Sequence, residues 1–211
     1  MEITWLGHSS FLIEDSKGKK ILTDPFDESL GYDIFSGNAD IVTISHHHFD
    51  HDYIKNITKN VPVIDKPGFF NYCDIPITGI TSYHDKMKGA KRGENNIFIF
   101  QVDEYRICHL GDLGYILSNN EISKLGQIDI LLIPVGGNYT IDGSEAAALS
   151  KAIHSHIVIP MHYKTPELSF QLDGLEDFLI NMKNGEKIAS NKFTINSKFI
   201  EYNQVKILDY K

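Results

Sequence analysis

The sequence lacks the features that mark membrane, secreted and nucleic-acid-binding proteins. No apolar run approaches the roughly 20 residues that a membrane-spanning helix needs. The first residues show no basic stretch followed by an apolar one, so we expect no signal peptide and a cytoplasmic location. The two cysteines, Cys73 and Cys108, have no CxxC spacing. That favours free thiols in a reducing compartment, with a single disulfide left open.

Positive charge is also scarce. The chain has 20 Lys and Arg residues against 28 Asp and Glu, a formal charge of −8. Because Lys and Arg bind phosphate backbones, this balance disfavours a nucleic-acid partner. The only dense basic stretch, residues 86–92, is interpreted first as a mobile, solvated loop and second as a rim that attracts anions.

Several common catalytic motifs are absent. The sequence contains no GxSxG nucleophile elbow, no GxxxxGK phosphate loop and no GxGxxG dinucleotide motif. The composition, 42% hydrophobic and 23% charged, is typical of a folded protein. No repeat or linker is visible, and we predict one domain over residues 1–211.

The most informative segment is residues 46–51, which packs four histidines and an aspartate into six positions directly after the apolar run 41–44. Imidazole nitrogens and carboxylate oxygens suit a divalent cation such as zinc. A surface cluster or tag-like tract is the less favoured interpretation, because tags lie at termini. In an extended loop His46 and His48 point the same way, so His47 is not a predicted ligand.

The predicted elements indicate stacked sheets flanked by helices. Strands are expected at 3–6, 10–13, 20–23, 41–44, 61–64, 75–81, 97–102, 105–108, 130–133 and 157–159. Helices are expected at 142–153 and 172–182, with a short one at 121–125. Four further His and Asp residues stand just past such strands, namely Asp24, His84, Asp112 and His162. Strand ends on a shared edge meet at one cleft, so we expect these side chains to converge with the cluster.

These residues resemble the metallo-β-lactamase-fold hydrolases. The signature HxHxDH is present at residues 46–51, and the residues at 24, 84, 112 and 162 follow in that family's order. The runs at 7–11, 22–26 and 159–163 look like a branch of small metal-dependent hydrolases. That branch is related to ascorbate-phosphate lactonase and to the phospholipase D that cleaves N-acyl phosphatidylethanolamine. The resemblance implies an α/β fold of the four-layer αββα sandwich type.

The resemblance also implies a site for two divalent cations, with zinc expected and manganese or iron as alternatives. One cation would be held by His46, His48 and His84, and the other by Asp50, His51 and His162. Asp112 would bridge both, and Asp24 would orient the histidine loop. Such a site activates water against an ester, lactone or phosphodiester of a small-molecule substrate. Asp50 and Asp112 would be the acidic residues of the catalytic centre, Asp112 also taking the nucleophile's proton.

Other polar residues keep two interpretations. His8 and His109 either support a metal ligand or contact substrate, or they only form a structural hydrogen bond. Tyr163 and Lys164 are hypothesised to contact substrate. Arg92 and Asn95 are hypothesised to form the edge of a lid over the cleft. We expect no catalytic role for His154 and His156. Thr140 or Asp142 is expected to cap a helix.

Two other functions are alternatives, because proteins of the same fold carry them out. A di-iron redox protein is one, although such proteins typically have an extra acidic ligand in the cluster and a fused flavin domain. A nucleic-acid-processing phosphodiesterase is the other, disfavoured by the acidic charge. β-Lactam hydrolysis is disfavoured by Asp112, where many zinc β-lactamases have cysteine. The sequence does not indicate the substrate, the metal in the cell or the oligomeric state.

Overall fold

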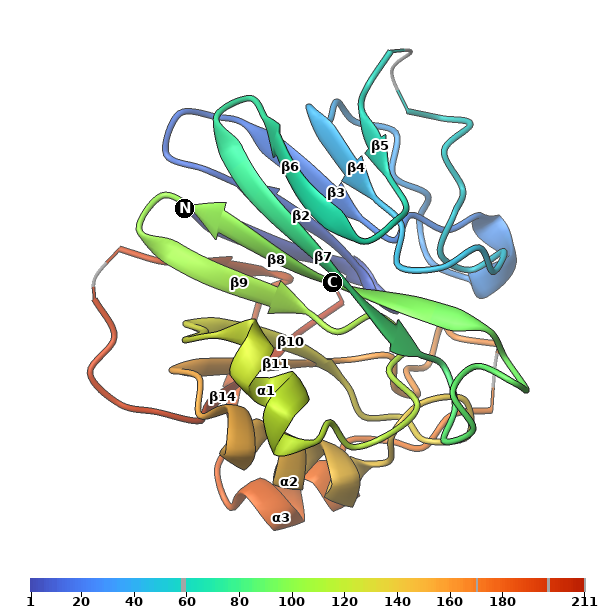
Figure 1. Ribbon diagram of the computed structural model, residues 1–211, viewed down its shortest axis with the longest axis vertical. Coiled ribbons are helices and arrows are strands. Elements are labelled where there is room, and N and C mark those ends of the chain that lie inside the picture. The colour runs from blue at the N-terminus through green and yellow to red at the C-terminus, as the bar shows by residue number, and fades with distance from the viewer. Residues whose placement is uncertain (58–59, 170, 197, 211) are drawn as a thin grey trace.

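Two β-sheets stack face to face in the computed structural model, which describes residues 1–57, 60–169, 171–196 and 198–210 (Figure 1). The six-stranded sheet has the order β13-β1-β2-β3-β4-β5. Its strands are β1 (Glu2–Gly7), β2 (Ser10–Glu14), β3 (Lys20–Thr23), β4 (Ile41–Thr43), β5 (Val63–Ile64) and β13 (Lys192–Thr194). Ile3, Ile13, Ile21 and Ile41 lie side by side across this sheet and are fully buried in the core between the sheets. The two-residue period of these strands therefore sets which face is inside.

The eight-stranded sheet has the order β12-β14-β11-β10-β9-β8-β7-β6. Its strands are β6 (Gly68–Tyr72), β7 (Ile75–Tyr83), β8 (Glu94–Val102), β9 (Tyr105–His109), β10 (Ile130–Pro134), β11 (Ile157–Met161), β12 (Glu186–Ile188) and β14 (Gln204–Leu208). Pairing is antiparallel from β6 to β9 and parallel from β9 onward. Every residue of β10 and β11 is buried, as expected for parallel strands that are covered on both faces.

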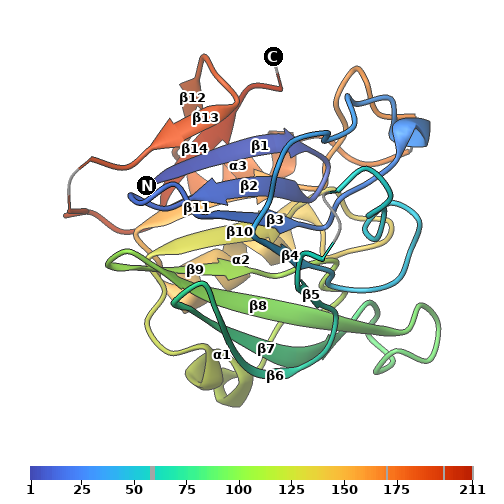
Figure 2. The ribbon, with the colours of Figure 1, turned by 90° about the horizontal axis from the view of Figure 1, so that it is seen from above.

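The α-helices among the described residues gather on the outer face of the eight-stranded sheet (Figures 1 and 2). They are α1 (Asn119–Leu125), α2 (Gly143–Ile153) and α3 (Glu176–Met182). The side chains of Ser118 and Asp142 form capping boxes at the starts of α1 and α2. The mixed α/β class with two stacked sheets is confirmed. On the outer face of the six-stranded sheet, Leu22 and Val42 pack under loop residues such as Phe35.

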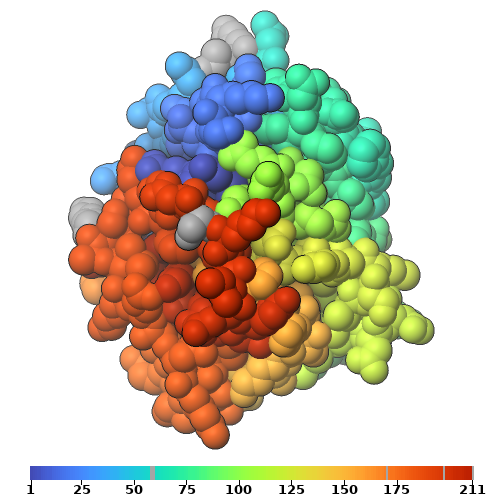
Figure 3. All heavy atoms as spheres, turned by 90° about the vertical axis from the view of Figure 1, so that its left-hand side faces the viewer, coloured from blue at the N-terminus to red at the C-terminus, as the bar shows by residue number. Residues whose placement is uncertain are grey.

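The chain's last strands join both sheets. β13 pairs with β1, and β14 pairs with β11. Figure 3 accordingly shows C-terminal residues (red and orange) packed beside the first strands (blue). Cys73 is exposed, Cys108 is buried, and both are free thiols. No helix in the described residues combines the length and apolar character that a bilayer span requires.

Candidate metal centre

The strand ends bring the predicted residues into one cluster. His8 follows β1, Asp24 follows β3, His84 follows β7, and His162 follows β11, while the histidine loop continues from β4 and Asp112 comes from the loop after β9. Three groups of metal-ligand atoms result, each with all its atoms within 4.8 Å of one another, and one of them, His46 with His51 and Asp112, connects the other two. The "His46 group" contains His46, His48 and His84, and the "His51 group" contains His8, Asp50, His51 and His162.

Several of these strand ends turn through left-handed backbone. The φ angles are 51° at His8, 42° at Asp24 and 52° at His162. Non-glycine residues rarely adopt this conformation, and each instance costs about 1–3 kcal/mol. The turn lets the chain leave the strand at once while its side chain enters the cluster. The carbonyl of His8 accepts hydrogen bonds from Trp5 Nε1 and the His162 amide, both at 3.1 Å, which ties two of the turns together.

Asp112 lies between the two groups. Its Oδ2 is 3.1 Å from His162 Nε2, 3.3 Å from His84 Nε2 and 3.9 Å from His46 Nε2. Its Oδ1 is 3.4 Å from His51 Nε2. The backbone before it must be glycine, because a Cβ at Gly111 (φ 56°) would lie 2.3 Å from Asn95 Oδ1. That same Asn95 oxygen accepts a hydrogen bond from the Asp112 amide at 2.9 Å and so fixes the carboxylate in place.

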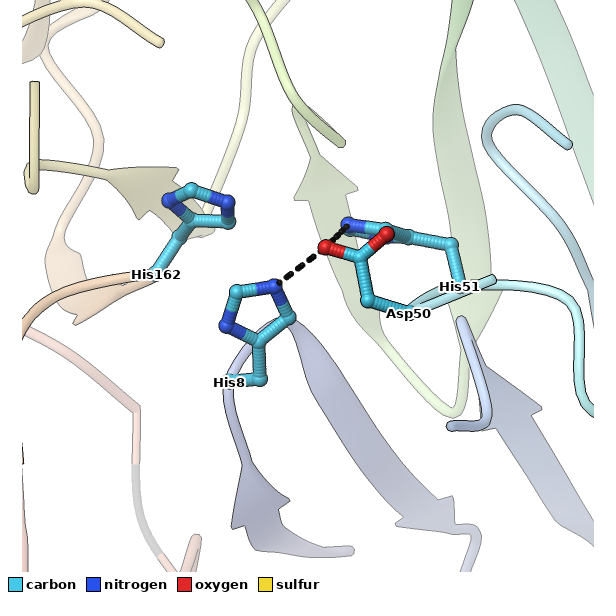
Figure 4. A group of neighbouring side chains, drawn as sticks. All are labelled: His8, Asp50, His51 and His162. Carbon is cyan, nitrogen blue, oxygen red and sulfur yellow. Dashed lines mark hydrogen bonds and ion pairs between the residues drawn. The ribbon is translucent and has the colours of Figure 1, made fainter. Parts of the chain in front are cut away.

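The His51 group is buried and internally hydrogen-bonded (Figure 4). His8 Nε2 is 3.2 Å from Asp50 Oδ2, and the same oxygen is 3.6 Å from His51 Nε2. Burial, with the nearby His162, lowers the pKa of His8 to about 4, so this ring is neutral at neutral pH. A neutral His8 that donates from Nε2 holds the Asp50 carboxylate toward the group.

Asp24 orients two histidines of the loop, His51 directly and His46 through Ser45. Asp24 Oδ1 accepts from the Ser45 amide at 2.7 Å, and Oδ2 accepts from Ser45 Oγ at 2.6 Å and from His51 Nδ1 at 2.9 Å. Because the Ser45 hydroxyl proton goes to Asp24, its oxygen is left to accept from His46 Nδ1 at 3.0 Å. Both imidazoles therefore carry a proton on Nδ1 and turn Nε2 toward Asp112. A carboxylate that fixes the tautomer of a histidine in this way is characteristic of metal sites.

The ionisation of the cluster suits cation binding. Burial, joined by the nearby His51, lowers the pKa of His46 well below 6.5. Burial alone would raise the pKa of Asp112, but His162 and His51 hold it well below its usual range. In the described structure, His46 Nε2, His51 Nε2 and Asp112 Oδ1 are buried atoms without a hydrogen bond. Buried polar atoms normally have partners, so these unsatisfied donors and acceptors fit the coordination of a cation.

A cleft of about 380 Å³ opens over the cluster. It is lined by His48, Phe49, Asp50, His84, Arg92, Asp112, Tyr139 and His162. The Arg92 guanidinium lies over the ring of Tyr139, with Cζ 5.0 Å from the centroid. This volume admits a small substrate, and the exposed rings of Phe49 and Tyr139 give the cleft apolar surface.

Other predicted residues lie outside the cleft. Tyr163 stacks on Trp5 at 5.4 Å, and with Lys164 it lines a separate cavity. Lys164 Nζ donates to the Leu168 carbonyl. His109 is buried, its Nε2 donating to the Ser9 carbonyl at 2.8 Å and its Nδ1 accepting from the Gly111 amide at 3.1 Å. These contacts correspond to its structural interpretation.

One sequence-based interpretation needs correction, and a second needs a refinement. Asn95 is fully buried, donates to Ser82 Oγ and the Leu110 carbonyl, and supports Asp112 from behind, so it is not a lid edge. The basic loop 86–92 is exposed as predicted, but its backbone is held by Asp85, which accepts hydrogen bonds from four of its amides. His47 is exposed and lies 3.3 Å from both Asp52 and Asp65, outside the cluster. His154 and His156 stack on Tyr202.

Sequence reasoning missed Ser45 and Asp85. Ser45 stands between the last strand residue and His46, a position from which a hydroxyl can reach both the strand end and the loop. Asp85 follows His84 and precedes a loop with glycines at 89 and 93, a composition typical of a turn organised by a carboxylate. Both signals are visible only once the neighbouring histidines are taken as site residues.

The chain is similar in sequence to metal-dependent hydrolases. The family model described as a beta-lactamase superfamily domain matches residues 2–162. A UPF0173 metal-dependent hydrolase of Methanosarcina barkeri is 31% identical over 195 residues, covering 78% of this chain and 84% of the relative. One from Archaeoglobus fulgidus is 27% identical and covers 91% of this chain and all of the relative.

A solved structure is similar over nearly the whole chain. It is that of a proposed Zn-dependent hydrolase of the metallo-beta-lactamase superfamily from Thermotoga maritima, with a TM-score of 0.83 and 37% identity. The match covers 98% of this chain and 97% of that one. Family match, relatives and fold agree, and this chain therefore belongs to the metallo-β-lactamase superfamily.

Proposed function

We propose that the protein is a hydrolase that uses two divalent cations, held on either side of Asp112, to cleave an ester, lactone or phosphodiester of a small substrate. His46, His48 and His84 would hold one cation, and Asp50, His51 and His162 the other, with Asp112 shared. The observation that supports this most is the position of Asp112. One of its oxygens lies near His84 and His162, and the other near His51.

When bound, the cations supply a water of lowered pKa and polarise the oxygen of the group under attack. The residues of the chain contribute positioning and proton transfer. Asp112 lines the cleft as a carboxylate, so it is placed to accept a proton from the attacking water. His8 and Asp24 keep Asp50 and His51 oriented through hydrogen bonds.

Zinc is the proposed metal, because imidazole and carboxylate ligands suit it and the Thermotoga maritima relative is described as Zn-dependent. Manganese and iron are the alternatives, since the same ligands suit both. The volume of the cleft supports a small-molecule substrate.

The test is metal analysis and a hydrolase panel on one purified sample. We expect about two metal equivalents per chain and hydrolysis of at least one ester, lactone or phosphodiester probe. A preparation that binds no metal even after reconstitution would contradict the site. An iron-containing sample with oxygen-dependent turnover and no hydrolysis would instead support the di-iron redox alternative.

A further inference from the structure

Arg92 places a positive charge in the cleft that holds the proposed ligands. The residue lines the cleft together with His48, His84 and Asp112. Among the described residues, no Asp or Glu oxygen lies within 4.0 Å of its guanidinium, and its recorded side-chain contact is the ring of Tyr139. An arginine without an acidic partner is notable in a chain whose formal charge is −8.

The backbone of Arg92 is fixed relative to the metal ligands. Asp85, the residue after His84, accepts hydrogen bonds from four backbone amides of its own loop, those of Met87, Gly89, Lys91 and Arg92, at 2.7–3.1 Å. The loop also closes on itself, because the His84 amide donates to the Gly93 carbonyl at 3.2 Å. Because the backbone of the loop is already ordered, little conformational entropy of the backbone is lost when Arg92 binds a ligand.

Two neighbouring lysines, Lys86 and Lys91, are not among the residues that line the cleft, whereas Arg92 lines both the cleft and an adjoining cavity. Lys86 pairs with Glu145 at 2.5 Å. Lys91 lines an adjoining cavity rather than the cleft. Within the cleft, the carboxylates of Asp50 and Asp112 belong to the proposed metal site. Arg92 thus supplies a donor for an incoming anion, and its guanidinium fork matches a carboxylate or a phosphate with two parallel hydrogen bonds.

We propose that Arg92 recognises a second anionic group on the substrate, separate from the bond that is cleaved. This inference rests on the proposed function, because it concerns the same cleft. The substrate class is then a small ester, lactone or phosphodiester that also carries a carboxylate or a phosphate. In this arrangement the cations bind the scissile end of the substrate and Arg92 binds its anionic end. The rings of Phe49 and Tyr139 flank the part of the substrate between the two ends.

The test is calorimetric binding of three non-hydrolysable probes to zinc-loaded protein. Butyrate has one anionic end, whereas glutarate and 4-phosphonobutyrate add a second carboxylate or a phosphonate. A charge-assisted hydrogen bond contributes about 1.5–3 kcal/mol, so we expect at least one two-ended probe to bind about tenfold more tightly than butyrate. The preferred probe shows whether the anionic end is a carboxylate or a phosphate.

Variants assign the effect to the side chain. Arg92→Gln should remove the advantage of the two-ended probe over butyrate. Lys91→Gln, one residue earlier on the same loop, should keep the advantage. Equal affinities of all three probes in the unmodified protein, or equal losses in both variants, would overturn the inference.

The measurement separates this inference from the proposed function because it needs no turnover. Protein that holds two zinc ions and binds the two-ended probe through Arg92, yet hydrolyses nothing, contradicts only the proposed function. Protein that hydrolyses neutral esters while Arg92→Gln leaves every affinity unchanged contradicts only the role of Arg92.

Discussion

The two groups of ligands on either side of Asp112 differ in how the protein encloses them. In the His46 group, His48 is exposed and faces the cleft. In the His51 group, His8, His51 and His162 are at most 1% exposed, and Asp24 and Asp50 bind two of these rings. The two groups therefore differ in their exposure to the cleft. Every member of the His51 group is buried, whereas the His46 group keeps one exposed imidazole, that of His48, at the cleft.

The largest effect is expected for Asp112→Asn, because this carboxylate lies between the two groups and would serve both proposed cations. Loss of the shared carboxylate and of a proton acceptor should lower hydrolysis by about 10²–10⁴. Metal content should fall at both positions. The measurement is turnover of a probe from the hydrolase panel with metal analysis on the same variant. Full activity in a folded variant would place the chemistry elsewhere.

Asp24→Asn should weaken the His51 group more than the His46 group, because Asp24 contacts His51 directly and His46 only through Ser45. An asparagine has one acceptor oxygen, whereas Asp24 accepts hydrogen bonds from both Ser45 and His51 through two. Loss of such an orienting carboxylate typically costs about 10–100-fold in metal affinity. Competition with a chelator should show one metal equivalent weakened more than the other. Equal weakening of both equivalents would show that the groups are not independent.

The pH dependence should also separate the groups. The carboxylates of Asp112 and Asp50 outweigh burial and raise the pKa of His51 well above 6.5, so its ring is protonated at neutral pH in the metal-free protein. A cation must displace that proton, and affinity at this group should rise up to about tenfold per pH unit until the pKa is reached.

The His46 group provides the internal control for this prediction. Burial lowers the pKa of His46, so this ring is already neutral at neutral pH. Calorimetry of zinc binding in two buffers of different ionisation enthalpy should detect one proton released for only one of two bound equivalents. A pH-independent affinity at both equivalents would contradict the difference.

The smallest effect is expected for His48→Gln. The residue is exposed, and water can occupy an open coordination position, so the loss of metal affinity should be smaller than in Asp24→Asn. His47→Gln is the matched control, because His47 contacts Asp52 and Asp65 outside the cluster. A loss in His47→Gln equal to that in His48→Gln would show that the loop, rather than the ligand, was disturbed.

Much of this arrangement could be predicted from the sequence, because strand periodicity and the histidine cluster are local signals. The strands at 20–23 and 41–43 lie where the apolar pattern indicated. Their polar neighbours meet in one cluster because strand ends share an edge. The extent of the domain and a cytoplasmic location stay predictions.

The elements that were missed depend on distant partners. β6 and β12–β14 were not predicted, and β12 and β13 are three-residue strands whose pairing partners, β14 and β1, are set by the tertiary fold. α3 begins at Glu176 rather than at 172, after Gly174 and without a side-chain cap. The buried support of Asp112 by Asn95 likewise joins β8 to the loop after β9, and no local pattern indicates that contact.

The carboxylate of Asp85 holds the backbone of the loop between two parts of the cleft. It joins the proposed metal ligand His84 and the proposed recognition residue Arg92 in one short continuous stretch, held by backbone amides. Since every residue type except proline has a backbone amide, Met87 and Lys91 can be exchanged without loss of these hydrogen bonds, whereas Gly89 (φ 81°) has no room for a Cβ. Substitutions at these two positions would therefore change the surface beside the cleft and leave the proposed ligand His84 and the backbone of Arg92 in place.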